Sequence, residues 1–92
     1  MALSFEWNEN KANTSSKKHN VSFEEATTVF GDASSITISD IRHSIDEDRF
    51  IIIGHSCKHR LVVVVHTERG DNIRIISARL ATKKERNFYE RK

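Results

Sequence analysis

Histidine, glutamate, tyrosine and arginine side chains occur in the combination needed to cleave RNA without a metal ion. This reaction requires a base to take the proton of the 2′-hydroxyl and an acid to protonate the leaving oxygen. The side chains that could move these protons are His19, His66, Glu68 and Tyr89. Fixed cations must also stabilise the charge on phosphorus in the transition state. The arginines that could supply them are Arg69, Arg74, Arg79 and Arg86.

Arginine suits this role because its planar guanidinium can pair with two phosphate oxygens at once. Each of these residues also has an ordinary structural role. A single arginine most often forms a surface ion pair, and a single histidine is most often solvated or hydrogen-bonded within the fold. Residue chemistry alone therefore goes no further than a basic α+β domain with side chains suited to nucleic acid, and it leaves both binding and cleavage open.

Three other kinds of site find little support. His55, Cys57 and His59 have ligand types that suit zinc, but a predicted turn divides them, and exposed hairpin residues are the better interpretation. Cys57 has no local signature of a catalytic nucleophile. The turn Glu68–Asn72 contains one glycine and no following helix, so it is a hairpin turn and not a phosphate-binding loop.

The charge is unevenly distributed along the chain. Residues 1–57 carry five basic and nine acidic side chains, a net charge of −4, whereas residues 58–92 carry ten basic and four acidic ones, a net charge of +6. A basic half of this kind suggests a polyanion or an acidic partner, although a solvated surface would have the same composition.

The bulk composition predicts one domain, residues 1–92, in a reducing compartment. The single Cys57 cannot form an internal disulfide, and no apolar run approaches the roughly 20 residues of a membrane span. No secretory signal or cofactor-binding motif is visible. We therefore expect a cytoplasmic protein that has no cofactor and no membrane segment.

Two helices are expected in the first third of the chain. Asn8 can cap the first, which would end at about His19 before a left-handed Asn20. Ser22 and Glu25 have the spacing of a capping box that opens the second. The side chains expected to face the core are Phe23, Ala26, Val29 and Phe30, and those expected to point outward are Glu24, Glu25 and Thr28.

Four strands are expected after these helices, with the segment Leu3–Trp7 as a further short strand or an extended lead-in. The four strands are Ser34–Ser39, Arg49–Ser56, Leu61–Thr67 and Ile73–Arg79, with a polar loop over Asp40–Asp48. Thr82 and Glu85 form a second capping box, which opens a basic C-terminal helix. The predicted fold class is α+β: two N-terminal helices, a four-stranded antiparallel meander and a C-terminal helix.

The turn of the last hairpin decides which side chains share a face. A five-residue turn centred on Gly70 would place His66 opposite Arg74. A four-residue turn would instead place His66 on one face with Ile73, Ile75, Ser77 and Arg79. A slip of one residue reverses every assignment, so both registers stay open.

Several blocks of the sequence resemble the BrnT toxin family, in the family's order and spacing. The front blocks are Phe5-Glu6-Trp7, Lys18-His19, Val21-Ser22-Phe23-Glu24-Glu25-Ala26 and Val29-Phe30. The back blocks are His66-Thr67-Glu68-Arg69-Gly70, Ile73-Arg74-Ile75-Ile76-Ser77-Ala78-Arg79, Ala81, Glu85-Arg86 and Tyr89. The resemblance covers nearly the whole chain.

This resemblance implies the toxin of a type II toxin–antitoxin module, with a fold similar to the RelE toxins. Such a toxin is a ribonuclease that arrests growth by cutting RNA, and a BrnA-type antitoxin neutralises it. The antitoxin dimer would hold two toxins and carry the part that binds operator DNA, so the toxin would reach DNA only through the antitoxin.

The resemblance also implies which residues form the site. The family motifs fall on Lys18, His19, Glu68, Arg69, Arg79, Arg86 and Tyr89. We predict four catalytic residues, His19, Glu68, Arg79 and Tyr89, and four residues that bind RNA phosphates, Lys18, Arg69, Arg74 and Arg86. Asn20 stands where the family has glycine, a change that a left-handed residue tolerates. His66 stands at a position that we associate with an aromatic residue.

Two alternative functions are compatible with the sequence. The first is a non-catalytic basic interaction module that binds a partner protein or nucleic acid. It is favoured because the sequence shows no acid–base pair at a fixed local spacing. An enzyme acting on small anionic substrates would need a pocket of roughly 300 Å³ or more.

Overall fold

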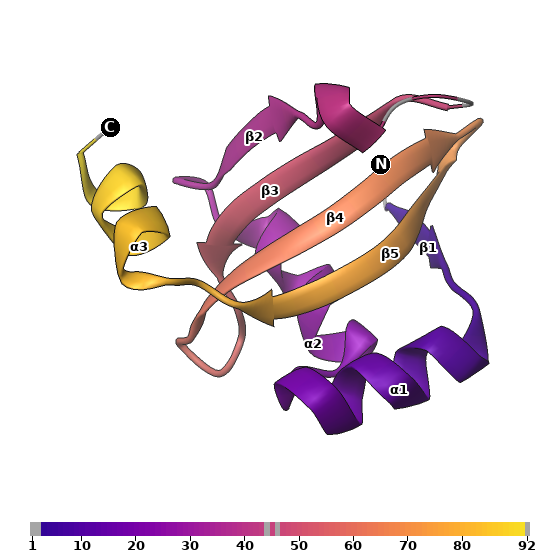
Figure 1. Cartoon of the computed structure of the whole chain (residues 1–92), viewed down its shortest axis with the longest axis horizontal. Coiled ribbons are helices and arrows are strands. Elements are labelled where there is room, and N and C mark those ends of the chain that lie inside the picture. Colours follow the sequence, from indigo (N-terminus) through magenta and orange to yellow (C-terminus); the bar gives the residue numbers. More distant parts are fainter. Residues whose placement is uncertain (1–2, 44, 46, 92) are drawn as a thin grey trace.

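A five-stranded mixed sheet forms the centre of the molecule (Figure 1). The structure is a computed structural model that describes residues 3–43, 45 and 47–91. Within these residues the strands are β1 (Ser4–Glu6), β2 (Ile36–Ser39), β3 (Arg49–His55), β4 (Leu61–Arg69) and β5 (Asn72–Leu80). They lie side by side in the order β1-β5-β4-β3-β2. Strands β2 to β5 are successive antiparallel neighbours, and β1 is parallel to β5.

The predicted α+β class and the antiparallel meander are confirmed. The sheet is larger than the predicted four strands because Leu3–Trp7, left open between a strand and a lead-in, contributes β1. Its pairing joins Phe5 to Ile73. Local alternation indicated an extended segment here, but nothing local identifies a pairing partner so distant in the sequence.

Three α-helices and two 3₁₀ turns complete the described part of the chain. They are α1 (Glu9–His19), α2 (Phe23–Thr28), η1 (Val29–Gly31), η2 (Ile41–His43) and α3 (Lys83–Glu90). The expected loop Asp40–Asp48 contains η2, and its positions 44 and 46 lie outside the described residues.

The predicted helix ends are largely confirmed. The Asn8 side chain accepts a hydrogen bond from the Lys11 N–H, 3.1 Å away, and Asn20 is left-handed with φ 58°. The Thr82–Glu85 capping box forms in both directions. At α2, the Ser22 hydroxyl accepts from the Glu25 N–H at 3.0 Å. The Glu25 side chain bonds to Ser56 and Arg60.

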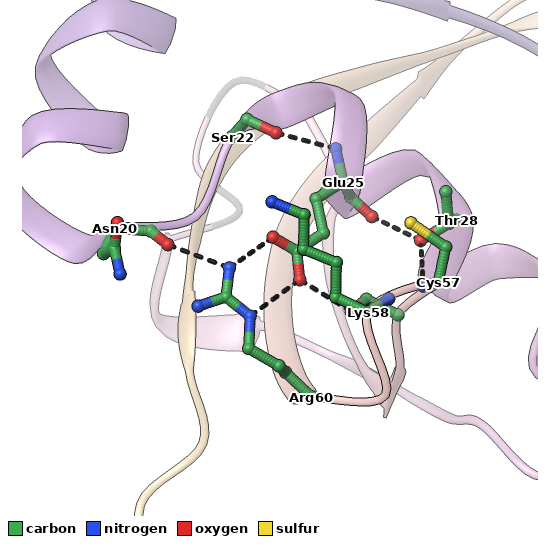
Figure 2. A network of polar contacts seen from close by, with 8 residues as sticks. Asn20, Ser22, Glu25, Thr28, Cys57, Lys58 and Arg60 are labelled. Carbon is green, nitrogen blue, oxygen red and sulfur yellow. Dashed lines mark hydrogen bonds and ion pairs between the residues drawn. The ribbon is translucent and has the colours of Figure 1, made fainter.

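Glu25 is buried, so the prediction that it points outward is wrong. Its side chain is 2% exposed and accepts hydrogen bonds from the Ser56 hydroxyl, at 2.6 Å, and from the Arg60 guanidinium. Arg60 also donates to the Asn20 carbonyl at 2.9 Å. Figure 2 shows this network, which joins the start of α2 to the β3–β4 turn. Arg60 holds the pKa of the Glu25 carboxyl below its ordinary value, although burial opposes the shift.

Thr28, also expected to point outward, contacts the same turn. Its hydroxyl accepts a hydrogen bond from the Cys57 N–H at 2.8 Å (Figure 2) and donates to the Glu25 carbonyl. A hydrogen bond made by a partly buried group is worth about 1 kcal/mol net. Of the three residues expected to point outward, Glu24 is exposed as predicted, whereas Glu25 and Thr28 contact the β3–β4 turn.

The two faces of the sheet have different cover. We call the face that carries Val62, Val64 and Ile75 the helical face, because α1 and α2 pack on it. The opposite face, which carries Val63 and Arg79, we call the open face. There α3 packs on one end only, through Tyr89 against a cluster of Ile53, Leu61 and Val63, and Val65 and Ser77 in the middle are half-buried.

A bulge in β5 sets which residues share these faces. Near the hairpin turn His66 pairs with Ile75 and Thr67 with Arg74, which is the register of the four-residue turn. Between His66 and Val65 the register shifts, so Ile76 is an extra residue and Val65 pairs with Ser77. Neither simple register is therefore right for the whole hairpin.

The bulge brings Arg74 and Arg79 to the same face. Two residues five positions apart on a regular strand point to opposite faces, but one extra residue restores the match. Arg74 pairs with Thr67 and Arg79 with Val63, two residues of the open face. His66 stays on the helical face with Ile75.

Candidate nucleic-acid interface

Three arginines of the open face each make an ion pair with a glutamate. The pairs, with their nitrogen–oxygen distances, are Arg69–Glu47 at 3.3 Å, Arg74–Glu6 at 2.9 Å and Arg79–Glu85 at 2.7 Å. Arg49 lies beside this row, because it pairs across the sheet with Thr67, the residue opposite Arg74. Sequence reasoning missed Arg49, since nothing local shows that it lies in line with Arg74.

The Arg79–Glu85 pair is bidentate and joins β5 to α3. The two Nη atoms of Arg79 donate to the two carboxylate oxygens of Glu85 at 2.7 and 2.8 Å. The Thr82 N–H donates to the same carboxylate at 2.9 Å. The Arg79 guanidinium lowers the pKa of Glu85 to about 2, and Glu85 raises the pKa of Arg79. Both groups are therefore charged at neutral pH.

A groove of about 330 Å³ runs between α1 and β5. Its basic lining comes from Lys11, Lys18 and His19 of α1, and its β5 side includes Ser77. The helix is held against the strand by the Ser15 hydroxyl, which donates to the Ala78 carbonyl at 3.2 Å. Ser77 also pairs with Val65 of the open face, so the groove and the open face meet at this residue.

Glu68 and His66 lie away from this region. His66 is 5% exposed on the helical face, with its ring centroid 4.9 Å from that of Phe30, and burial lowers its pKa. Glu68 is exposed near the hairpin turn, opposite Ile73. From Ile73 to Arg79 the strand extends about 20 Å, at roughly 3.3 Å per residue. The structure therefore does not bring Glu68 together with Arg79.

Tyr89 is largely buried and holds α3 in place. Its hydroxyl donates to Asp32 Oδ2 at 2.8 Å, and His55 Nδ1 lies 3.2 Å from the Tyr89 hydroxyl oxygen. Because the single hydroxyl hydrogen is used on Asp32, the His55 contact requires a proton on Nδ1. Burial and Asp32 raise the pKa of Tyr89. The sequence did not identify Asp32 or His55 as partners, since these contacts span long separations.

The predicted site residues thus fall into several groups. Lys18 and His19 share the groove beside β5, and Arg69, Arg74 and Arg79 share the open face. Arg86 is exposed on α3, one residue after Glu85. Tyr89 is in the α3 packing interface, and Glu68 lies at the hairpin end of β4, next to Arg69 in sequence but on the opposite, helical face.

The structure does not gather the side chains of the His55–His59 segment into a cluster of metal ligands. Among the described residues, no group of three or more histidine, cysteine, aspartate or glutamate side chains is arranged to hold a metal ion. Cys57 is exposed, and His59 is a left-handed turn residue with φ 60°. Across all residues that the structure describes, no helix is both long and apolar enough to cross a membrane.

Comparison with known proteins gives one family and one solved structure of interest. A family model described as "Ribonuclease toxin, BrnT, of type II toxin-antitoxin system" matches residues 7–85. The 1.1 Å crystal structure of the Brucella abortus ribonuclease toxin BrnT is similar, with a TM-score of 0.67 and 20% sequence identity. The match covers 89% of this chain and 100% of the Brucella chain, and it confirms the fold. No curated protein matches the sequence.

Proposed function

Because this chain belongs to the BrnT family of ribonuclease toxins of type II toxin–antitoxin systems, we propose that it cleaves RNA on the open face of its sheet. Cleavage is independent of metal ions and occurs in the cytoplasm, where it inhibits translation and growth. The observation that supports this is the bulge at Ile76, which brings Arg74 and Arg79 to one face together with Arg69.

The RNA backbone crosses β5 at Ser77. On one side of this residue the groove offers Lys18 and His19, and on the other the open face offers Arg74 and Arg79. A phosphate near Ser77 would have cations on both sides, and phosphate contacts of this kind supply most of the affinity for a nucleic-acid backbone.

Arg79 stabilises the charge on phosphorus. Its guanidinium has five N–H donors, of which two bond to Glu85 and a third contacts the Leu80 carbonyl at 3.3 Å. With its side chain 40% exposed, Arg79 can reach a phosphate through its remaining donors while Glu85 fixes its orientation. A preoriented cation of this kind needs little reorganisation when the charge develops.

His19 is the proton carrier that shares the groove beside β5 with Lys18. Imidazole can give or take a proton close to neutral pH. The 2′-oxygen attacks phosphorus and its proton passes to a base, while the bond to the 5′-oxygen breaks and that oxygen receives a proton. The products are a 2′,3′-cyclic phosphate and a 5′-hydroxyl end. We assign Tyr89 a positioning role, because its hydroxyl is bonded to Asp32.

A BrnA-type antitoxin neutralises the protein. Two toxins bind one antitoxin dimer, and operator DNA is contacted through the antitoxin. This part of the proposal rests on membership of the family, which implies a cognate antitoxin.

The proposal is tested by incubating the purified chain with RNA in the presence of excess chelator. Cleavage that leaves 5′-hydroxyl ends is expected. Cleavage that requires added magnesium and leaves 5′-phosphate ends would contradict metal independence. Salt-dependent RNA binding without any cleavage would favour the non-catalytic interaction module instead.

A further inference from the structure

An apolar groove of about 350 Å³ lies on the open face between α3 and β2. We call it the α3–β2 groove. Its lining residues are Ile38, Ile51, Ile53, Lys84, Glu85 and Phe88. Ile38 on one side is 43% exposed and Phe88 on the other is 49% exposed. Large apolar side chains on two elements thus face solvent across one groove.

The chemistry of the lining favours a protein over a nucleobase. Recognition of an unstacked base uses hydrogen bonds to its polar edges as well as stacking. The polar groups that line this groove are Lys84 and Glu85, and Glu85 is already bonded to Arg79 and to the Thr82 N–H. The isoleucines offer apolar contact only, which suits an aliphatic or aromatic side chain of a protein.

The neighbouring edge of the sheet also suits a polypeptide. Strand β2 is the last in the sheet order, so within the described residues its outer edge has no strand neighbour. Ile41, just after β2, is 84% exposed and lines a separate hollow with Arg49 and Phe50. An exposed strand edge next to an apolar groove is a place where a protein segment can pair its backbone and insert a side chain.

The charge around the groove indicates the character of the partner. Lys84 lines the groove, and Lys83 and Arg86 are also exposed on α3, against one exposed carboxylate, Glu90. The Glu85 carboxylate is already paired with Arg79. Complementarity therefore requires carboxylates on the partner beside its apolar anchor.

We propose that the α3–β2 groove binds an acidic, amphipathic segment of the cognate antitoxin, which inserts a bulky apolar side chain between Ile38 and Phe88. This inference rests on the proposed function, since it names the surface through which neutralisation occurs. Glu85 lines the groove and is bonded to Arg79. A segment seated there lies directly beside Arg79 and blocks the approach of an RNA phosphate.

The test measures antitoxin affinity and RNA cleavage separately, with the full-length chain and the full-length antitoxin. Phe88→Lys and Ile38→Lys place a charge in the groove at exposed positions, and Leu3→Lys is the matched control, since Leu3 is also exposed, at 54%, but outside the groove. We expect both groove variants to weaken antitoxin binding by about 30-fold or more, as loss of an apolar anchor does. RNA cleavage by the free variants stays within about two-fold of the unsubstituted chain.

The charge of the partner is tested with Lys84→Glu, which should weaken antitoxin binding, whereas Lys58→Glu on the β3–β4 turn should not. Unchanged antitoxin affinity in both Phe88→Lys and Ile38→Lys would overturn the proposal. Loss of RNA cleavage with unchanged antitoxin affinity would also overturn it and would assign the groove to RNA. If the unsubstituted chain binds antitoxin but cleaves no RNA, the proposed function is contradicted. The groove proposal is then decided by the antitoxin affinities of the variants alone.

Discussion

Arg79 and Glu85 meet side by side, with one guanidinium Nη atom donating to each carboxylate oxygen, at 2.7 and 2.8 Å. The pair closes the corner between the end of β5 and the first turn of α3. It therefore has two roles, because it fixes the helix to the sheet and holds the guanidinium that we assign to phosphate in one orientation. The two roles can be separated by experiment.

The structural role is tested with Glu85→Gln. The pKa of Glu85 is lowered from 4.5 to about 2, so its stabilisation is present above pH 4.5 and is lost as the pH falls towards 2. We expect the free energy of unfolding at pH 7 to fall by about 1 kcal/mol in the variant, a small value because Arg79 is partly exposed and the pair is screened by solvent. Urea denaturation at several pH values measures this. A variant as stable as the unsubstituted chain at pH 7, with the same acid dependence, would show that the pair contributes nothing.

The catalytic role is tested with Arg79→Gln and Arg79→Lys. We expect both to lower the rate of RNA cleavage by about 100-fold or more, because a single preoriented donor is worth that much and a lysine ammonium cannot replace the planar fork. Arg91→Gln removes the same charge from an exposed position near the end of α3 and serves as the control. Full growth inhibition by a folded Arg79→Gln variant would remove Arg79 from the site.

The proton carrier is tested with His19→Gln compared with His66→Gln. Loss of a general acid or base lowers the rate by about 100-fold or more and removes one limb of the pH–rate profile. We expect that result for His19, which lines the groove beside β5, and an unchanged profile shape for His66, which is 5% exposed on the helical face. Identical pH profiles for His19→Gln and the unsubstituted chain would contradict the assignment.

His66 should instead govern acid stability. Burial lowers its pKa below the ordinary value of 6.5, so the unfolded chain binds a proton before the folded chain does. Stability therefore falls as the pH drops below 6.5, until the folded-state pKa is passed. We expect His66→Phe to show a weaker loss of melting temperature between neutral and mildly acid pH. The same loss in both proteins would indicate that another group is responsible.

The Glu25–Arg60 pair should be needed for stability and not for cleavage chemistry. Arg60→Met leaves the carboxylate of Glu25 buried without its main partner, and an uncompensated buried charge is costly. We expect a clear fall in melting temperature, larger than for Lys58→Met on the exposed part of the same turn. Glu25→Gln combined with Arg60→Met should recover part of the loss, and purely additive effects would show that the two residues are not coupled.

Local signals in the sequence predicted much of the fold. Asn8, Asn20, Thr82 and Glu85 define helix ends because caps act within a few residues. The apolar runs around Ile52 and Val63 predicted buried strands, because the length and composition of a run are also local signals. What the sequence did not predict depends on distant partners. The β1–β5 pairing is one case, and the burial of Glu25 against Arg60 is another.

The candidate site likewise combines features that local signals identified with features that depend on residues distant in the sequence. The arginines were identified by charge and residue type, but their common face depends on the extra residue at Ile76, which no local pattern reveals. Tyr89 was expected to take part in chemistry, and its contact with Asp32 became visible only in three dimensions. Glu68 and Arg79 were grouped by residue type, yet opposite faces of the sheet and the length of β5 separate them.

The bulge also constrains how this strand can change over generations. The segment from Arg74 to Arg79 serves two surfaces at once, because Ile75 and Ala78 enter the helical core while Arg74 and Arg79 face outward. Removing or adding one residue between the two arginines would move the side chains of half the strand to the opposite face of the sheet, which would expose core residues and bury a charge. Single substitutions along β5 can be tolerated, whereas insertions and deletions cannot. We therefore expect the length of this segment to be under stronger selection than most of its side chains.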